Sequence, residues 1–128
     1  MHAWKALSAE QKIEWILRVG VFGEFLGHGL LALGGKKDWI SWISQLTGLD
    51  ASVATTLLLV VGIADVVTAF VILVKPVKPL LLWMAFWGFW TALVRPLVGI
   101  GWLDFIERFA NWAAPLALYY LLPKQERK

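Results

Sequence analysis

The stretch WILRVGVFGEFLGHGLLAL, residues 15–33, is an apolar run that contains a cation, a carboxylate and an imidazole. With the two residues before it, the run reaches about 20 residues, the length of a helix that crosses a hydrocarbon core of about 30 Å. The glycine pair that follows it is a helix-stop signal. We therefore predict a transmembrane helix over 13–33, with Arg18, Glu24 and His28 inside it.

The composition of the 128-residue chain extends this prediction to the whole molecule. Hydrophobic residues make up 59% of the chain, charged residues only 16%, and the mean hydropathy is +0.69. A soluble domain of this size has no room to hide so much apolar surface, so we expect the excess to face lipid. The absence of cysteine excludes thiolate metal sites and thiol nucleophiles, and no phosphate loop, catalytic triad or metal cluster is recognisable. The net charge of +3 comes mostly from lysine and arginine in the loops, which in a membrane protein report its orientation. We therefore expect no nucleic-acid partner.

Three further apolar segments also have spanning length. They cover residues 51–74, 78–98 and 105–122, and prolines or charged residues bound each of them. Together with the first helix they predict an all-α fold, a bundle of four transmembrane helices that forms a single integral membrane domain over residues 1–128.

A shorter segment, residues 38–47, lies between the first two spans. Its apolar residues Trp39, Ile40, Ile43 and Leu46 share one face at helical spacing. Because the segment is too short to cross a bilayer, it indicates an interfacial amphipathic helix with tryptophans at headgroup level. A packed surface helix that covers the end of the bundle fits the same pattern.

Loop charges predict the orientation of this bundle. One side carries seven cations and the other side carries four. The seven are Lys5, Lys12, Lys75, Lys78, Lys124, Arg127 and Lys128, and the four are Lys36, Lys37, Arg95 and Arg108. The positive-inside rule therefore puts both termini in the cytoplasm, and we expect a bacterial cytoplasmic (inner) membrane.

Each predicted helix has one side of small and polar residues when its positions are turned by about 100° per residue. That pattern is typical of a bundle with a polar interior. On the first helix, Gly20, Gly23 and Gly27 form a stripe beside the polar face, which predicts the close approach of a neighbouring helix. The polar residues that face inward are Arg18, Glu24, His28, Asp65, Arg95 and Asn111.

Depth along the helices sorts these charges into two layers. The inner layer has one cation, Arg18, for two carboxylates, Glu24 and Asp65. Two carboxylates that compete for one arginine cannot both stay ionised cheaply, so we expect Glu24 to be protonated part of the time and to form a short proton relay with His28. The outer layer holds His28, Arg95, Asn111 and Glu107. The alternative is a static network that only sets the helix register.

An aromatic face marks the third span. Trp83, Phe86, Trp87 and Trp90 follow one another at helical spacing in LLLWMAFWGFW. The face suits either a wall for a planar ligand, such as a quinone, or a surface that faces lipid or a partner. We favour the second reading slightly, and with it a homo-oligomer or a subunit of a larger membrane complex.

A short pattern runs through the first span and the loop after it, formed by Leu17-Arg18, Phe25-Leu26, His28-Gly29 and Lys36 or Lys37. With this pattern, the first two spans resemble those of DoxX-like small membrane proteins. In the second span, Asp65 stands where the family has an acidic residue, more often glutamate, while Glu24 and the tryptophan-rich third span depart from the family. The resemblance implies a small integral membrane subunit, linked to quinone-dependent oxidation of sulfur compounds or to partner oxidoreductases.

Three functions follow from these residues. The first is a quinone-interacting subunit, which would be the membrane subunit of a quinone-linked oxidoreductase. Its catalytic residues would be Glu24, His28 and Asp65. The second is a non-catalytic assembly or anchoring subunit, and the third, ranked last, is a proton-coupled carrier. A two-histidine haem site within one chain is not expected, because His28 is the one histidine inside a span. The residues expected to bind the cofactor are Arg18, His28, Arg95, Asn111 and Trp87.

Overall fold

The structure is a computed structural model in which residues 2–123 are described. Lys124, Arg127 and Lys128, which contributed to the predicted orientation, lie outside this range. Within it every regular element is a helix, as expected for an all-α fold. In chain order these are α1 (His2–Ala6), α2 (Ala9–Leu33), α3 (Lys37–Thr47), α4 (Ala51–Val74), α5 (Lys78–Leu97), α6 (Trp102–Ile106) and α7 (Ala110–Leu121).

Three of these helices, α2, α4 and α5, are long and apolar enough to cross a membrane. They have 25, 24 and 20 residues and correspond to the first three predicted spans. The helix α2 begins four residues before the predicted start at 13, because Ser8 and Gln11 form a capping box that supplies partners for its first backbone amides. Asp50 caps α4 by accepting a hydrogen bond from the Val53 amide at 2.9 Å.

The fourth predicted span, 105–122, is divided into two helices. The turn between α6 and α7 is held by short-range hydrogen bonds, from the Arg108 amide to the Phe105 carbonyl and from the Phe109 amide to the Ile106 carbonyl. Bonds of this spacing tighten the backbone and end an α-helix. The first turn of α7 then lies directly against α5, where a Cβ on Gly88 would overlap the Asn111 carbonyl. With 12 residues, α7 is roughly 18 Å long, shorter than a hydrocarbon core of about 30 Å.

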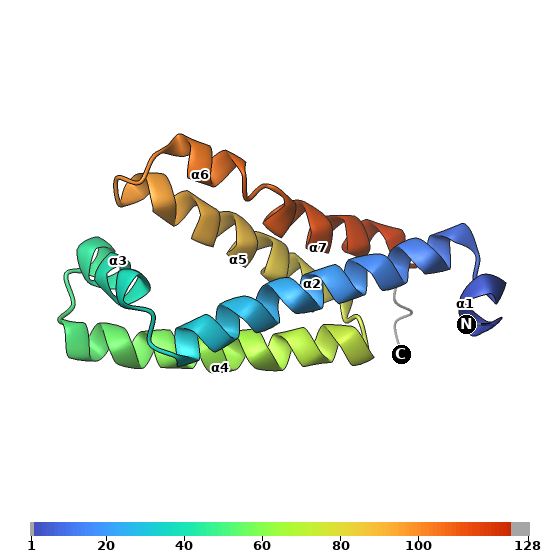
Figure 1. Ribbon diagram of the computed structural model, residues 1–128, viewed down its shortest axis with the longest axis horizontal. Helices are drawn as coiled ribbons and strands as arrows, with labels where there is room; N and C mark the ends of the chain where they lie inside the picture. The colour runs from blue at the N-terminus through green and yellow to red at the C-terminus, as the bar shows by residue number, and fades with distance from the viewer. Residues whose placement is uncertain (1, 124–128) are drawn as a thin grey trace.

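The long helices lie side by side in an elongated bundle (Figure 1). The helix α2 packs along α4, and α7 packs between α5 and α2. The short helix α3 covers one end of α4, while α1 stands at the opposite end, where α7 also ends. The helix α3 therefore occupies the position predicted for 38–47, over the end of the bundle.

The core of the bundle is narrow and the outer surface is apolar. Large residues such as Phe25, Ile72 and Met84 are buried along the line where α2, α4 and α5 meet. On the outside of α4, however, Val60, Ile63 and Val67 are each more than half exposed. A helix that is apolar all round and buried on one side only is suited to a lipid environment.

The expectation that Gly20, Gly23 and Gly27 pack against a neighbouring helix is wrong. A Cβ added to any of these three glycines would meet no atom within 4 Å. The face of α2 that contacts α4 instead contains Val21, Phe25, Gly29 and Ala32, all of them buried. These residues repeat at helical spacing on another side of α2, so the close approach of α2 and α4 occurs at Gly29.

Candidate ligand-binding cavity

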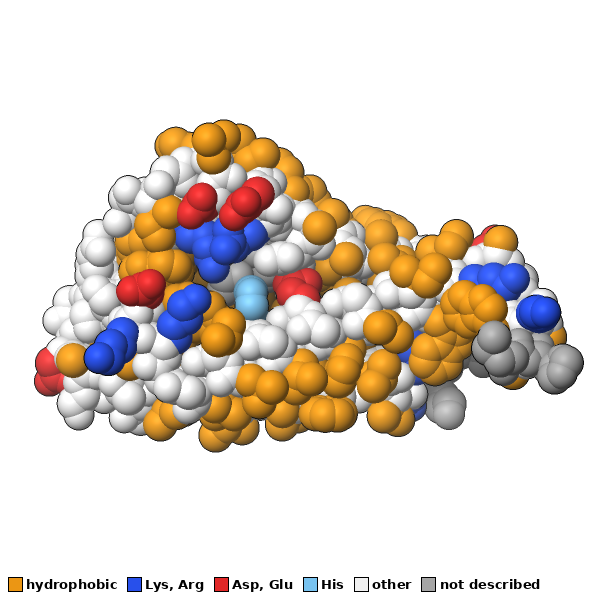
Figure 2. Space-filling view, viewed as in Figure 1, with side chains coloured by type: hydrophobic (Ala, Val, Ile, Leu, Met, Phe, Trp, Pro, Cys, Tyr) orange, Lys and Arg blue, Asp and Glu red, His pale blue; other side chains and the backbone are white. Residues whose placement is uncertain are grey.

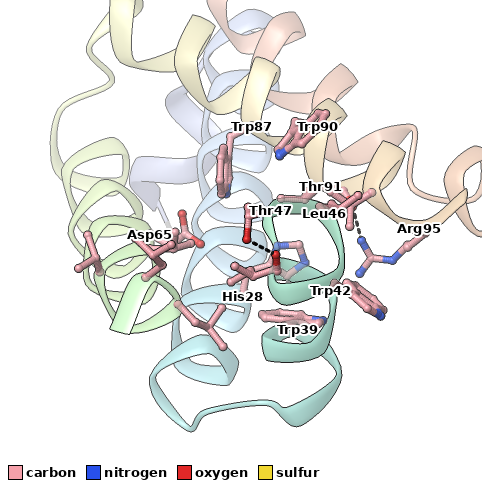
Figure 3. A pocket seen from close by; sticks show the side chains of 16 residues that line it. His28, Trp39, Trp42, Leu46, Thr47, Asp65, Trp87, Trp90, Thr91 and Arg95 are labelled. Carbon is pink, nitrogen blue, oxygen red and sulfur yellow. Dashed lines mark hydrogen bonds between the residues drawn. The ribbon is translucent and has the colours of Figure 1, made fainter. Parts of the chain in front are cut away.

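A cavity of about 350 Å³ lies at the end of the bundle that α3 covers. Its walls come from α3, α4 and α5, and His28 of α2 points into it (Figure 3). The surface is hollowed on one face, where acidic, basic and histidine side chains gather among hydrophobic ones (Figure 2). Four indoles and five polar side chains define its chemistry: Trp39, Trp42, Trp87, Trp90, His28, Thr47, Asp65, Thr91 and Arg95.

Contact between the backbones of α2 and α4 positions His28 and Asp65. A Cβ on Gly29 would lie 2.6 Å from the Val66 Cγ2 atom and 2.9 Å from the Gly62 carbonyl oxygen, so the absence of a side chain at Gly29 lets the two helices approach closely there. His28 precedes Gly29 in α2, and Asp65 follows Gly62 by one turn in α4. Both side chains consequently emerge beside the helix contact and line the cavity.

The helix α3 supplies the indoles of Trp39 and Trp42. Left-handed glycines stand on either side of α3, Gly35 with φ of 70° and Gly48 with φ of 76°, and these turns fold the helix back over the bundle. The Trp39 ring lies edge-on to the His28 imidazole, with 5.6 Å between ring centroids. The amphipathic pattern of α3 therefore serves to close the cavity with aromatic side chains.

Arg95 is a buried cation at the opposite side of the cavity from Asp65 (Figure 3). Its side chain is only 6% exposed and donates a hydrogen bond to the Thr91 carbonyl of its own helix. The guanidinium lies over the Trp42 ring at 5.2 Å from the centroid. Among the described residues, no carboxylate lies within 4.0 Å of the Arg95 guanidinium. The arginines that form ion pairs in this part of the chain are Arg18 and Arg108.

Glu24 does not line the cavity. Its Oε2 atom is buried and has no hydrogen-bond partner among the described residues. The Glu24 and Asp65 carboxylates are near enough to repel one another electrostatically. Arg18 does not compensate them, so the predicted inner layer of one cation between two carboxylates is not formed.

Arg18 instead binds the end of α4. It pairs with Glu14 at 3.1 Å and donates to the Ile72 carbonyl at 3.3 Å and the Val74 carbonyl at 3.1 Å. These are carbonyls of the last turn, which have no partner within the helix. Asn111, in the first turn of α7, does not line the cavity either. Glu107, which was expected in the outer layer, pairs with Arg108 at 2.6 Å.

The aromatic face of α5 is divided between two environments. Trp87 and Trp90 line the cavity, whereas Trp83 and Phe86 are 48% and 56% exposed on the outside. Trp83 stacks on Trp87, with centroids 5.5 Å apart and an interplanar angle of 21°. The face is therefore divided: Trp87 and Trp90 lie on the cavity, and Trp83 and Phe86 face outward.

The site thus joins His28, Asp65, Arg95 and Trp87 from the predicted set, and leaves Glu24, Arg18 and Asn111 outside its lining. Sequence reasoning placed Trp39 and Trp42 at the membrane interface and did not assign them to a site. Their position on the apolar face of a helix flanked by glycines was the available signal. The comparisons with protein families, with curated proteins and with solved structures find no match for this chain. The DoxX-like resemblance consequently remains a prediction.

Proposed function

We propose that the protein is a quinone-interacting subunit of a membrane redox complex, and that the cavity under α3 binds the quinone ring. The observation that carries this proposal is the convergence on a single cavity of four indoles, one imidazole and one guanidinium that has no carboxylate within 4.0 Å among residues 2–123. A volume of about 350 Å³ is within the range of small-molecule sites, which are mostly apolar with a few placed polar groups.

The residues present fit such a ring. Indole faces stack favourably on planar rings, and Trp87 and Trp90 stand on one side of the cavity while Trp39 and Trp42 stand on the α3 side. Quinone oxygens need hydrogen-bond donors, and Arg95 has N–H groups beyond the one given to the Thr91 carbonyl. A bound quinone would supply two-electron, two-proton redox chemistry, which no side chain of this chain provides.

The protein's own contribution would be binding and proton handling. Arg95 would hold one oxygen, and His28 would hydrogen-bond the other from the α2 side. Asp65 lines the same cavity and would accept or return a proton there, with Glu24, whose carboxylate is close enough to feel the Asp65 charge, as a second carrier. Because Glu24 and Asp65 have no basic partner within 4.0 Å among the described residues, a proton on one of them relieves their mutual repulsion.

We further propose that α6, its turn and α7 together make a fourth membrane crossing. The support is that they run back along α5 and that α7 ends beside the start of α2 (Figure 1). With the loop charges, this topology puts both termini in the cytoplasm of a bacterial cell, and α3 and the cavity near the outer face.

The test is purification in a mild detergent, followed by lipid extraction and by titration with the soluble quinone menadione. We expect a quinone in the extract and saturable menadione binding that His28→Ala weakens by about tenfold, the effect of losing one good hydrogen bond in a buried site. Extracts without quinone, together with no saturable binding, would refute the proposal.

A matched pair of aromatic variants controls for non-specific effects. Trp87→Leu removes a cavity wall, whereas Phe86→Leu removes a neighbouring ring that is 56% exposed. We expect Trp87→Leu to weaken menadione binding by about fivefold, from the loss of ring stacking, and Phe86→Leu to leave it unchanged. Equal losses in both would show that the binding does not take place in the cavity.

A second candidate is an assembly or anchoring subunit without a redox ligand. The observation that favours it is the pair of outward rings, Trp83 and Phe86, which suits a helix of a partner or a second copy of this chain. Isolation from native membranes separates the two candidates. A co-purifying subunit lost on Phe86→Leu, in a preparation without quinone, would favour assembly over quinone binding.

A further inference from the structure

The strongest unexplained feature of the cavity is the charge of Arg95. A cation that is 94% removed from solvent normally has a carboxylate or several hydrogen bonds to compensate it. Arg95 has one hydrogen bond to a carbonyl and a ring contact with Trp42. Arg95 is also one of the residues that line the cavity.

The surrounding charges do not supply the missing anion. Asp104 and Glu107 act on Arg95 electrostatically, but neither lies within 4.0 Å of it. Glu107 is instead held by Arg108. Asp65 is the one carboxylate in the lining, and Figure 3 shows it on the far side of His28 from Arg95.

Positive charge also predominates around the imidazole. Arg95, Arg108 and Lys36 are all near enough to His28 for their charges to act on it. Lys36 stands over the Trp39 ring at 4.8 Å, at the α3 side of the cavity. A ligand that enters past these cations gains from carrying negative charge.

We propose that the cavity selects a planar ligand that carries an ionised oxygen, such as a hydroxyquinone anion, and that Arg95 is the residue that selects it. This rests on the proposed function, because it names the class of quinone that the same cavity takes. A guanidinium presents N–H groups in a planar fork that matches an acidic oxygen and its neighbouring carbonyl, and charge-assisted hydrogen bonds are about twice as strong as neutral ones.

Two commercially available rings of nearly equal size test the proposal. Menadione is a neutral naphthoquinone, and in lawsone a hydroxyl that is ionised at neutral pH replaces the methyl group of menadione. Because the chain has no cysteine, neither quinone can add to a thiol. Equilibrium dialysis of each against the protein in lipid nanodiscs, with empty nanodiscs as the blank, measures the two affinities.

We expect the wild-type protein to bind lawsone about tenfold more tightly than menadione, the effect of one charge-assisted hydrogen bond. Arg95→Gln should reduce this preference to about twofold or less, because glutamine can still donate a hydrogen bond to menadione but lacks the charge that strengthens the bond to lawsone, so that lawsone binding weakens more than menadione binding. Arg108→Gln is the matched control: it removes a positive charge that also acts on His28, but Arg108 is paired with Glu107 and does not line the cavity, so most of the preference should remain.

The outcomes separate this inference from the proposed function. Saturable binding of menadione that equals or exceeds that of lawsone overturns the inference and leaves the quinone site standing. No binding of either ring defeats both. If Arg95→Gln does not fold, as judged by circular dichroism and gel filtration, the wild-type comparison of the two rings still decides.

Discussion

Arg18 shows at the level of one residue how a buried charge can serve the fold and not the site. It is 7% exposed, and its donors reach the carbonyls of Ile72 and Val74 at the end of α4. Those carbonyls would otherwise lack partners in an apolar environment, which costs free energy. Arg18 also lies over the Trp15 ring at 3.9 Å, so its position is held from both sides.

Replacing Arg18 with methionine should therefore lower stability. We expect a loss of about 3 kcal/mol in the free energy of unfolding, because the α4 carbonyls lose charge-assisted hydrogen bonds. Glu14→Gln, which removes only the partly exposed partner, should cost less than about 1 kcal/mol. Unfolding in detergent mixtures, followed by circular dichroism, measures both, and equal stability of Arg18→Met and wild type would contradict the assignment.

At the scale of elements, three glycines determine how the helices meet. Gly29 and Gly62 let the backbones of α2 and α4 touch, and Gly88 does the same for α5 and α7. The α2–α4 contact also positions His28 and Asp65, so the geometry of the site depends on it. The predicted glycine stripe had the composition of a contact but lies on the wrong side of α2.

Alanine at these glycines gives a direct test with internal controls. Gly29→Ala and Gly88→Ala place a methyl group against backbone and should cost about 1–3 kcal/mol each, as over-packing does. Gly23→Ala, in the same helix as Gly29 but with no atom within 4 Å, should be neutral or stabilise by up to about 1 kcal/mol. If all three alanines have the same effect on thermal unfolding in detergent, the helix contacts described above are not correct.

At the scale of the whole molecule, the membrane topology can be tested by labelling single introduced cysteines, because the chain has no cysteine of its own. Ser41 in α3 and Lys75 after α4 are exposed at opposite ends of the bundle. In right-side-out spheroplasts, we expect a membrane-impermeant maleimide to label Ser41→Cys at once, and Lys75→Cys only after permeabilisation.

The same experiment tests the fourth crossing. Gln125→Cys, beyond α7, should behave like Lys75→Cys if α6 and α7 cross the membrane together. Labelling of Gln125→Cys in intact spheroplasts, as for Ser41→Cys, would mean three crossings and would withdraw the fourth.

Local patterns in the sequence were enough for the secondary structure. Length and hydropathy predicted α2, α4 and α5 within a few residues, because both are local properties of the sequence. The break between α6 and α7 was missed, because the composition there resembles that of a continuous helix. After the break, Asn111 of α7 packs on Gly88 of α5, a contact between residues far apart in the chain.

Sequence also supplied most of the polar residues of the cavity, since charged groups inside a predicted span stand out. It could not group them correctly. Which charges meet depends on how each helix is rotated about its axis, and that rotation is set by backbone contacts such as Gly29 on Gly62. Only the tertiary structure therefore showed that Arg18 binds the end of α4 and not the carboxylates. It also showed that only part of the aromatic face of α5 lines the cavity, and that the tryptophans of α3 contact His28 and Arg95.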